Sequence, residues 1–314
     1  MTTHYSESTN ADAAGTSAPP RWRLSAGRSL WLDRPRIMAI INATPDSFSD
    51  GGLHLDPRRA SAAAARLVEQ GAALLDVGGE PTRAGAEAVP EADQIERVVP
   101  VIRAIREAGV GVPITIDTTR SAVARAALDA GADAVNDVSG GTDDPAILSL
   151  AAERGCGIIL MHRLRAPADD RYSDRYTSPP VYGDVVEDVM RALRGSRDEA
   201  ARAGVAEASL VLDPGLGFGK SVDDNLRLIS STHRLQELGR PLLGAASRKS
   251  FVGRVCVPEG ADPPPPTDRL GGSIAMTLAQ LARGVRLFRV HDVEAQSRAI
   301  RAWWAVEQAG RGGR

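Results

Sequence analysis

Residues 242–253 combine chemically active side chains with a local pattern that would expose them. An apolar run leads into a polar turn, in which Lys249 stands between Arg248 and Ser250, and a helical pattern follows. The chain contains only two lysines, Lys220 and Lys249, so nearly all of its 38 basic residues are arginines. An ammonium is a compact point charge that the planar guanidinium of arginine does not replace. We therefore interpret Lys249 as a functional cation placed just after a buried strand.

Other polar residues follow short apolar runs elsewhere in the chain and could bind a small molecule. Carboxylates and amides can hydrogen-bond a planar heterocycle, and arginine or histidine side chains with backbone amides can hold a polyphosphate. Two carboxylates in one cleft could alternatively form a metal-binding or acid–base pair. No histidine stands at a metal-ligand spacing from them, so a structural zinc site is not expected. These residues are Asn42, Asp117, Asn136, Asp213, Arg289 and His291, joined by Arg83 from a glycine-rich loop.

The segment 213–221 contains Gly-Lys-Ser after an apolar run, which is similar to a phosphate-binding P-loop. The P-loop pattern requires glycine at position 214, where this chain has Pro214. We therefore interpret Asp213 as a carboxylate at a strand end. The glycines that follow it would form a flexible turn able to approach a ligand closely.

Eight short apolar runs alternate with helical patterns between residues 37 and 288. Such continuous runs are typical of parallel strands buried on both faces. The helical segments have readable ends: Asp56 and Pro57 begin the first, and Gly71 ends it. The runs lie at 37–41, 72–75, 113–116, 134–135, 158–161, 210–212, 242–246 and 285–288, and later helices are expected at 91–108, 121–130, 181–203 and 223–238.

Eight strand–helix repeats predict an α/β fold, a (β/α)8 TIM barrel. A doubly wound sheet usually has fewer strands and would not explain a polar residue at nearly every strand end. In a (β/α)8 barrel the active site lies at the C-terminal ends of the strands. The strand-end residues are therefore predicted to surround one mouth, where Phe48 and Phe218 also indicate a flat ligand.

Length and composition are consistent with a single barrel. The 314 residues predict one barrel domain over residues 25–310, preceded by a disordered tail over residues 1–24 without the pattern of a secretory leader. The net charge of −2 gives no case for nucleic acid, and no apolar run is long enough to span a membrane. The two cysteines, Cys156 and Cys256, form no CxxC pair, which indicates a cytoplasmic protein.

Three stretches resemble the dihydropteroate synthase family: residues 41–52, 213–220 and 247–251. The resemblance extends from about residue 37 to the last helix, in the family's order. It implies that 6-hydroxymethyl-7,8-dihydropterin pyrophosphate condenses with 4-aminobenzoate, with Mg²⁺ assistance, to give 7,8-dihydropteroate and pyrophosphate. It also implies a role in folate biosynthesis, inhibition by sulfonamides, and a homodimer formed through C-terminal helices such as the one carrying Ala275 and Leu278.

The resemblance implies specific roles for individual residues. The positions that match pterin contacts are Asp117, Asn136, Met161, Asp213 and Lys249. Those that match pyrophosphate contacts are Asn42, Thr82, Arg83, Arg289 and His291, with Asn42 also the expected Mg²⁺ ligand. Aminobenzoate is expected at Phe48, Phe218, Arg248 and Ser250. Catalysis is assigned to Lys249, Asp117, Arg289 and His291.

The chain departs from the family pattern at three positions that bear on substrate binding. Pro81 stands where the family usually has Ser, Ala84 replaces a Pro near the aminobenzoate, and Ala245 replaces a Gly beside the pterin. Alternative functions therefore stay open: a pterin-binding paralogue without synthase activity, or a methyltetrahydrofolate-binding barrel that serves a corrinoid protein. A Schiff-base aldolase built on Lys249 is a further alternative.

Overall fold

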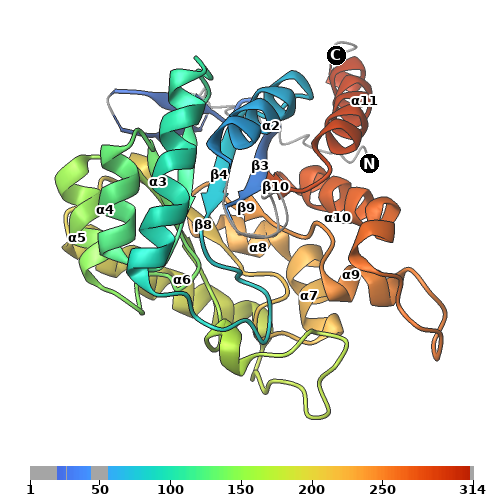
Figure 1. Ribbon diagram of the computed structural model, residues 1–314. Helices are drawn as coiled ribbons and strands as arrows, with labels where there is room; N and C mark the ends of the chain where they lie inside the picture. Colours follow the sequence, from blue (N-terminus) through green and yellow to red (C-terminus); the bar gives the residue numbers. More distant parts are fainter. Residues whose placement is uncertain (1–19, 26, 44–55, 312–314) are drawn as a thin grey trace, which may run out of the picture.

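Eight parallel strands form the centre of the molecule, with helices on their outer side (Figure 1). This computed structural model describes residues 20–25, 27–43 and 56–311. The sheet runs in the order β8, β7, β6, β5, β4, β3, β10, β9, and a parallel bridge from Leu212 to Leu242 brings its two edges together. The predicted (β/α)8 barrel is thus confirmed. Its strands are β3 (Arg36–Asn42), β4 (Leu74–Gly78), β5 (Ile114–Asp117), β6 (Ala134–Asp137), β7 (Gly157–Met161), β8 (Leu210–Asp213), β9 (Leu243–Gly244) and β10 (Leu287–Val290).

The helices place an apolar face against the barrel, where residues such as Val98, Ile102 and Ile105 are fully buried. Short 3₁₀ turns lie at Pro167–Asp169, Glu207–Ser209 and Pro266–Asp268. The helices are α2 (Pro57–Glu69), α3 (Glu91–Glu107), α4 (Ser121–Asp129), α5 (Ala146–Arg154), α6 (Val185–Arg202), α7 (Val222–Ser230), α8 (Thr232–Gln236), α9 (Ser250–Val255), α10 (Leu270–Ala282) and α11 (Val293–Arg311).

Several predicted boundaries differ from the structure, and the largest differences concern α6, the segment 223–238 and β4. Helix α6 begins at Val185 rather than residue 181, because the Asp184 side chain caps it by accepting hydrogen bonds from the N–H groups of Val186 and Glu187. The segment predicted as one helix over 223–238 is divided into α7 and α8 at Ser231. Strand β4 continues through Asp76 to Gly78, so Asp76 lies inside the strand and not at its end.

An N-terminal hairpin covers the end of the barrel at which the strands begin. Strand β1 (Arg21–Arg23) pairs antiparallel with β2 (Ser29–Trp31). Trp22 is fully buried, and its indole N–H donates to the Ser209 carbonyl at 2.8 Å. The hairpin's apolar side chains form one cluster with inward-facing strand residues, among them Met38. The predicted end of the tail at residue 24 therefore needs correction, because residues 21–24 pack against the barrel.

Replacing Trp22 with alanine is expected to lower the free energy of unfolding by about 3–5 kcal/mol, since it leaves a cavity under the barrel. The closeness of the packing supports this, because a Cβ added at Gly157 would lie 2.9 Å from the Trp22 ring. Urea denaturation would measure the change. Trp31 in the same hairpin is 44% exposed and provides the control: its alanine variant should lose less than about 1 kcal/mol. Equal losses in the two variants would contradict the prediction.

Candidate active site

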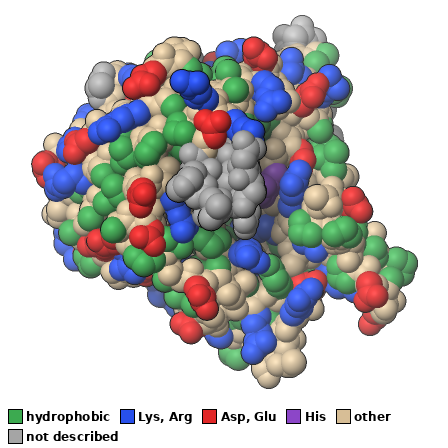
Figure 2. Space-filling view, viewed as in Figure 1, with side chains coloured by type: hydrophobic (Ala, Val, Ile, Leu, Met, Phe, Trp, Pro, Cys, Tyr) green, Lys and Arg blue, Asp and Glu red, His purple; other side chains and the backbone are tan. Residues whose placement is uncertain are grey.

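A cavity of about 720 Å³ opens among the C-terminal ends of the strands. Figure 2 shows basic side chains and a histidine gathered around a hollow on this face. Phe48 lies outside the described residues, so its predicted place is not tested. Every other predicted site residue lines the cavity: Asn42, Thr82, Arg83, Asp117, Asn136, Met161, Asp213, Phe218, Arg248, Lys249, Ser250, Arg289 and His291.

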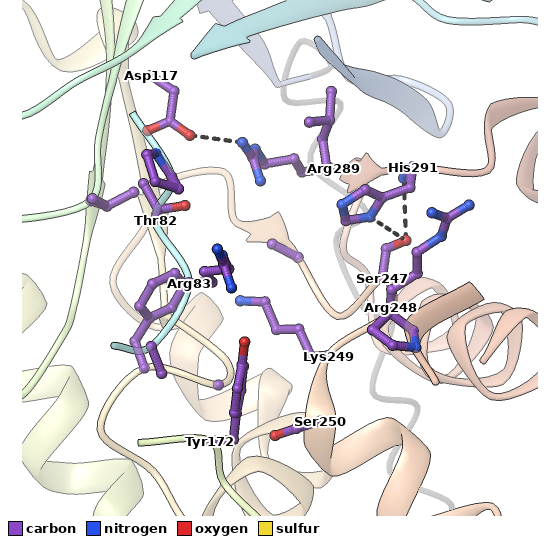
Figure 3. A pocket seen from close by; sticks show the side chains of 18 of the residues that line it. Thr82, Arg83, Asp117, Tyr172, Ser247, Arg248, Lys249, Ser250, Arg289 and His291 are labelled. Atoms are coloured by element: carbon purple, nitrogen blue, oxygen red, sulfur yellow. Dashed lines mark hydrogen bonds and ion pairs between the residues drawn. The ribbon is translucent and has the colours of Figure 1, made fainter. Parts of the chain in front are cut away.

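Arg289 at the end of β10 joins two buried carboxylates. Its Nε donates to Asp76 Oδ2 at 2.6 Å and its Nη2 donates to Asp117 Oδ2 at 2.7 Å. Figure 3 shows the second of these contacts at one side of the cavity. Asp76 also accepts hydrogen bonds from Thr115 and, at 3.2 Å, from Asn136 Nδ2. Pairing of this kind offsets the cost of burying charges, so the guanidinium is held in a fixed orientation.

The second oxygen of Asp117 has no hydrogen-bond partner among the described residues. Asp117 Oδ1 is buried and accepts no hydrogen bond in the described part of the chain. Burial raises the pKa of Asp117, and the nearby Arg289 opposes this rise. A buried acceptor without a donor costs free energy that a bound ligand can recover. Asp117 is therefore placed to accept hydrogen bonds from a ligand in the cavity.

Asp213 at the end of β8 faces the same cavity. Its Oδ1 accepts a hydrogen bond from the Gly215 N–H at 2.7 Å. Burial raises the pKa of the Asp213 carboxyl, and the positive charge of Lys249 opposes this rise. Asp213 is thus a further buried carboxyl that lines the cavity, and the positive charges of Lys249 and Arg289 act on it.

The Lys249 side chain points into the cavity (Figure 3). Its ammonium donates to the Leu216 carbonyl and lies 4.3 Å from the centre of the Phe218 ring. A Cβ at Gly217 would lie 2.8 Å from Lys249 Cδ, so the side chain occupies space that only glycine leaves free. Burial lowers the pKa of Lys249 to about 8, against the opposing effect of Asp213. The surroundings therefore fit an unbranched ammonium side chain.

Lys220, the other lysine, is fully buried beneath the loop that follows β8. Its Nζ donates to the carbonyls of Gly215 and Phe218 at 2.9 Å each and contacts His162 Nδ1 at 2.9 Å. Burial lowers the pKa of Lys220 to about 7. The Gly-Lys-Ser segment is thus not a phosphate-binding loop, since its lysine instead fixes the loop that carries Phe218.

The turn before α9 is held by contacts with neighbouring elements. Arg248 has a φ of 60°, the left-handed conformation, and its Nε donates to Asp292 Oδ2 at 2.9 Å. The Arg248 guanidinium is thus already paired with Asp292, and its role toward aminobenzoate stays a prediction. Arg269 Nη1 donates to the Arg248 carbonyl at 3.0 Å and fixes the turn from the other side.

His291 is hydrogen-bonded to Ser247 through both its backbone N–H, at 3.2 Å, and its ring Nδ1, at 3.1 Å. Burial, with the neighbouring Arg289, lowers the pKa of His291 to about 4. The imidazole is therefore neutral near pH 7. His291 can hydrogen-bond a ligand there, and the positive charge near it comes from Arg289.

The sequence interpretation missed several residues of the site. Asp76, which is buried and does not itself line the cavity, is the most consequential omission because it pairs with Arg289, and its only signal was a single carboxylate in an apolar run. Four others come from connections without a recognisable motif: Tyr172, Asp174, Arg175 and Arg269.

Comparison with known proteins identifies the family. A model of the family described as "Pterin binding enzyme" matches residues 38–291. A dihydropteroate synthase of Synechocystis sp. is 41% identical over 276 residues, which cover 87% of this chain and 91% of that protein. The chain belongs to the dihydropteroate synthase family. The predicted family resemblance is thus confirmed.

Solved structures of dihydropteroate synthases share the fold of this chain. The Xanthomonas albilineans enzyme with 4-aminobenzoic acid is 42% identical, with a TM-score of 0.80, over 92% of this chain and 98% of that one. The same organism's enzyme in complex with 7,8-dihydropteroate is 41% identical, with a TM-score of 0.78, over 92% and 99% of the two chains.

Proposed function

We propose that this protein is a dihydropteroate synthase that condenses 6-hydroxymethyl-7,8-dihydropterin pyrophosphate with 4-aminobenzoate. The products are 7,8-dihydropteroate and pyrophosphate. The observation that carries the proposal is the buried Asp117 oxygen, which no described residue hydrogen-bonds, in a cavity that also holds Arg289 and Lys249. These groups fit a ligand with a donor-rich heterocycle at one end and a negatively charged leaving group at the other.

The pterin occupies the deep part of the cavity in this proposal. Asp117 and Asp213 accept hydrogen bonds from its amino-pyrimidine edge, each charge-assisted bond contributing about 1.5–3 kcal/mol. Asn136 supplies an amide to the same edge, and Met161 packs against the ring. The Lys249 ammonium donates a hydrogen bond to the pterin from the cavity side, and it gives up its hydrogen bond to the Leu216 carbonyl to do so.

The pyrophosphate lies nearer the mouth, where Arg83, Arg289 and His291 can donate to it, together with Thr82. The bond between the pterin methylene carbon and the pyrophosphate oxygen breaks, and its electron pair leaves with the pyrophosphate. Arg83 and Arg289 stabilise this developing charge. The lone pair of the aminobenzoate nitrogen forms the new bond to the methylene carbon, and the nitrogen then loses a proton. No protein nucleophile is needed.

Asn42 fits as a magnesium ligand. No group of three or more His, Cys, Asp or Glu side chains suited to a metal occurs in the part of the chain that the structure describes. Mg²⁺ commonly binds through one or two protein oxygens together with substrate phosphates and water, so the Asn42 amide oxygen at the mouth is a suitable donor. When bound, the ion would neutralise charge on the pyrophosphate.

The aromatic amine lies between the pterin and α9. Ser250 can donate its hydroxyl to the carboxylate, and Phe218 offers a ring face to the aromatic ring. Arg248, engaged with Asp292, adds positive charge on the same side. Pro81, Ala84 and Ala245 also line the cavity, so the three family departures are at substrate-facing positions.

The decisive experiment is pyrophosphate release from the pterin substrate with and without 4-aminobenzoate. Release that requires 4-aminobenzoate, with formation of dihydropteroate, is the expected result. Binding of the pterin substrate without release would favour the non-catalytic paralogue. A methyltetrahydrofolate-binding barrel would bind methyltetrahydrofolate instead, and borohydride trapping of a carbonyl compound would reveal an aldolase.

The pH dependence provides a separate prediction. If the ammonium of Lys249 is the form that binds the pterin, kcat/KM for that substrate should fall as pH rises through about 8, the pKa that burial gives Lys249 in the free protein. The profile would be measured at saturating 4-aminobenzoate. In Lys249→Arg the remaining activity should lack this fall, because guanidinium stays charged. An alkaline fall at the same pH in both proteins would contradict the assignment.

We also propose that the enzyme is a cytoplasmic homodimer that associates through α10. On this helix Ala275 is exposed and Leu278 is partly exposed. Light scattering would test the mass, and Ala275→Arg should lower it to that of one chain. None of the described helices has the length and hydropathy required to cross a membrane.

A further inference from the structure

The connection between β7 and α6, residues 162–184, supplies cavity side chains that the proposed function has not used. Tyr172, Asp174 and Arg175 line the cavity beside Arg269. Tyr172 is partly buried, and its hydroxyl makes no hydrogen bond to any residue the structure describes. Figure 3 shows the ring at the same end of the cavity as Ser250, with the hydroxyl pointing into the cavity. A free phenol group thus faces open space in the site.

Buried contacts on both sides of Tyr172 hold it in place. Asp170 Oδ2 accepts a hydrogen bond from the Gly219 N–H at 2.7 Å, and Ser173 Oγ accepts one from Asn225 Nδ2 at 3.2 Å. Both Asp170 and Ser173 are buried. The Arg175 guanidinium lies 5.5 Å from the centre of the Tyr172 ring. The backbone on both sides of Tyr172 is therefore held in place before any ligand binds, as the support of a binding residue should be.

The contacts of Arg269 indicate that Tyr172 lies at the end of the cavity where the aromatic amine is proposed to bind. Arg269 donates to the Arg248 carbonyl, two residues before Ser250. Burial lowers the pKa of Arg269, and Asp174 and Tyr172 oppose this, so both side chains lie near its guanidinium. The segment that carries Tyr172 is thus adjacent to the turn before α9. In Figure 3, Tyr172 and Asp117 are on opposite sides of the cavity.

We propose that Tyr172 is a positioning residue for the aromatic amine and limits which para-substituted anilines the site accepts. This inference rests on the proposed function and extends it to a residue outside the family motifs. The Tyr172 ring would pack against the aniline ring, where aromatic pairs add stability beyond the area they bury. Its hydroxyl would donate to the para substituent, a carboxylate in the case of 4-aminobenzoate.

Steady-state kinetics of the full chain would test the proposal. Tyr172→Ala is expected to raise KM for 4-aminobenzoate by about tenfold, while KM for the pterin substrate changes by less than about twofold. Tyr172→Phe keeps the ring and should raise KM for 4-aminobenzoate by about threefold. The same variants should bind the pterin substrate normally in the absence of the amine. A positioning role predicts this split between the two substrates, which a general structural defect would not produce.

Tyr176→Phe is the matched control. The Tyr176 hydroxyl donates to Asp170 in the same connection, and Tyr176 does not line the cavity. KM for 4-aminobenzoate should stay unchanged in this variant. If KM for 4-aminobenzoate rose equally in Tyr176→Phe, or did not rise in Tyr172→Ala, the proposal for Tyr172 would be overturned. Synthase activity of the wild-type protein would still uphold the proposed function in that case. A wild-type protein that releases no pyrophosphate would overturn both.

Discussion

Replacing Asp117 with asparagine is expected to lower kcat/KM for the pterin substrate by about 1,000-fold. The Asp117 oxygen that accepts no hydrogen bond from a described residue is the acceptor that the ligand would use. The amide of asparagine can turn its N–H groups toward the N–H donors of the pterin edge, so that two donors face each other. A polar site discriminates strongly against a ligand whose hydrogen-bonding groups do not match its own. The loss should therefore appear in binding of the pterin as well as in turnover.

The fold should tolerate the Asp117 substitution. Arg289 keeps its 2.6 Å contact with Asp76, so no cation is left unpaired. Calorimetric titration with a pterin that lacks the pyrophosphate would measure the binding loss, and urea denaturation would measure stability. Asp129→Asn is the control, because Asp129 lies on α4, the helix that follows β5, and its side chain is 56% exposed. Normal pterin binding by Asp117→Asn would contradict the assignment.

Replacing Lys249 with arginine is expected to lower kcat/KM by about 100-fold, although the positive charge is retained. The lysine stem runs past Gly217, where an added carbon would lie 2.8 Å from Lys249 Cδ. A branched guanidinium would have to displace this loop or the Phe218 ring. The substitution should therefore impair pterin and amine binding together, because Phe218 is expected to contact the amine.

Two further Lys249 variants would separate shape from charge. Lys249→Gln removes the charge with little change in length, and Lys249→Met keeps the length without any hydrogen-bond donor. Both should lose at least as much activity as Lys249→Arg if the ammonium binds the pterin. Thermal unfolding of each variant would show whether the loop remains folded. Turnover in Lys249→Arg equal to that of the wild-type would refute the requirement for an ammonium.

The position of the site followed from the sequence because a barrel collects the C-terminal strand ends at one mouth. Asp117, Asn136 and Asp213 were placed in this way, each from a polar residue after an apolar run. Asp76 was not, since it lies two residues before the end of β4 and only the folded barrel brings it to Arg289.

Other properties of the site depend on packing that no local pattern reports. The neutral state of His291 results from its burial beside Arg289. Lys220 and Lys249 are the same residue type, yet backbone carbonyls enclose Lys220 whereas Lys249 faces the cavity. Tyr172 lies in a polar connection without periodicity, so neither its place nor its orientation could be predicted.

The contacts of Arg289 also bear on the stage of its synthesis at which the chain can form the complete binding site. Asp76 and Asp117 leave the ribosome early, whereas the guanidinium between them is separated from them by 213 and 172 residues of chain. A nascent chain that stops before β10 holds two adjacent carboxylates without their shared cation, and their repulsion opposes close packing there. We therefore expect a chain that ends before β10 to bind the pterin less well than the full chain, because the Arg289 contacts with Asp76 and Asp117 cannot form in it.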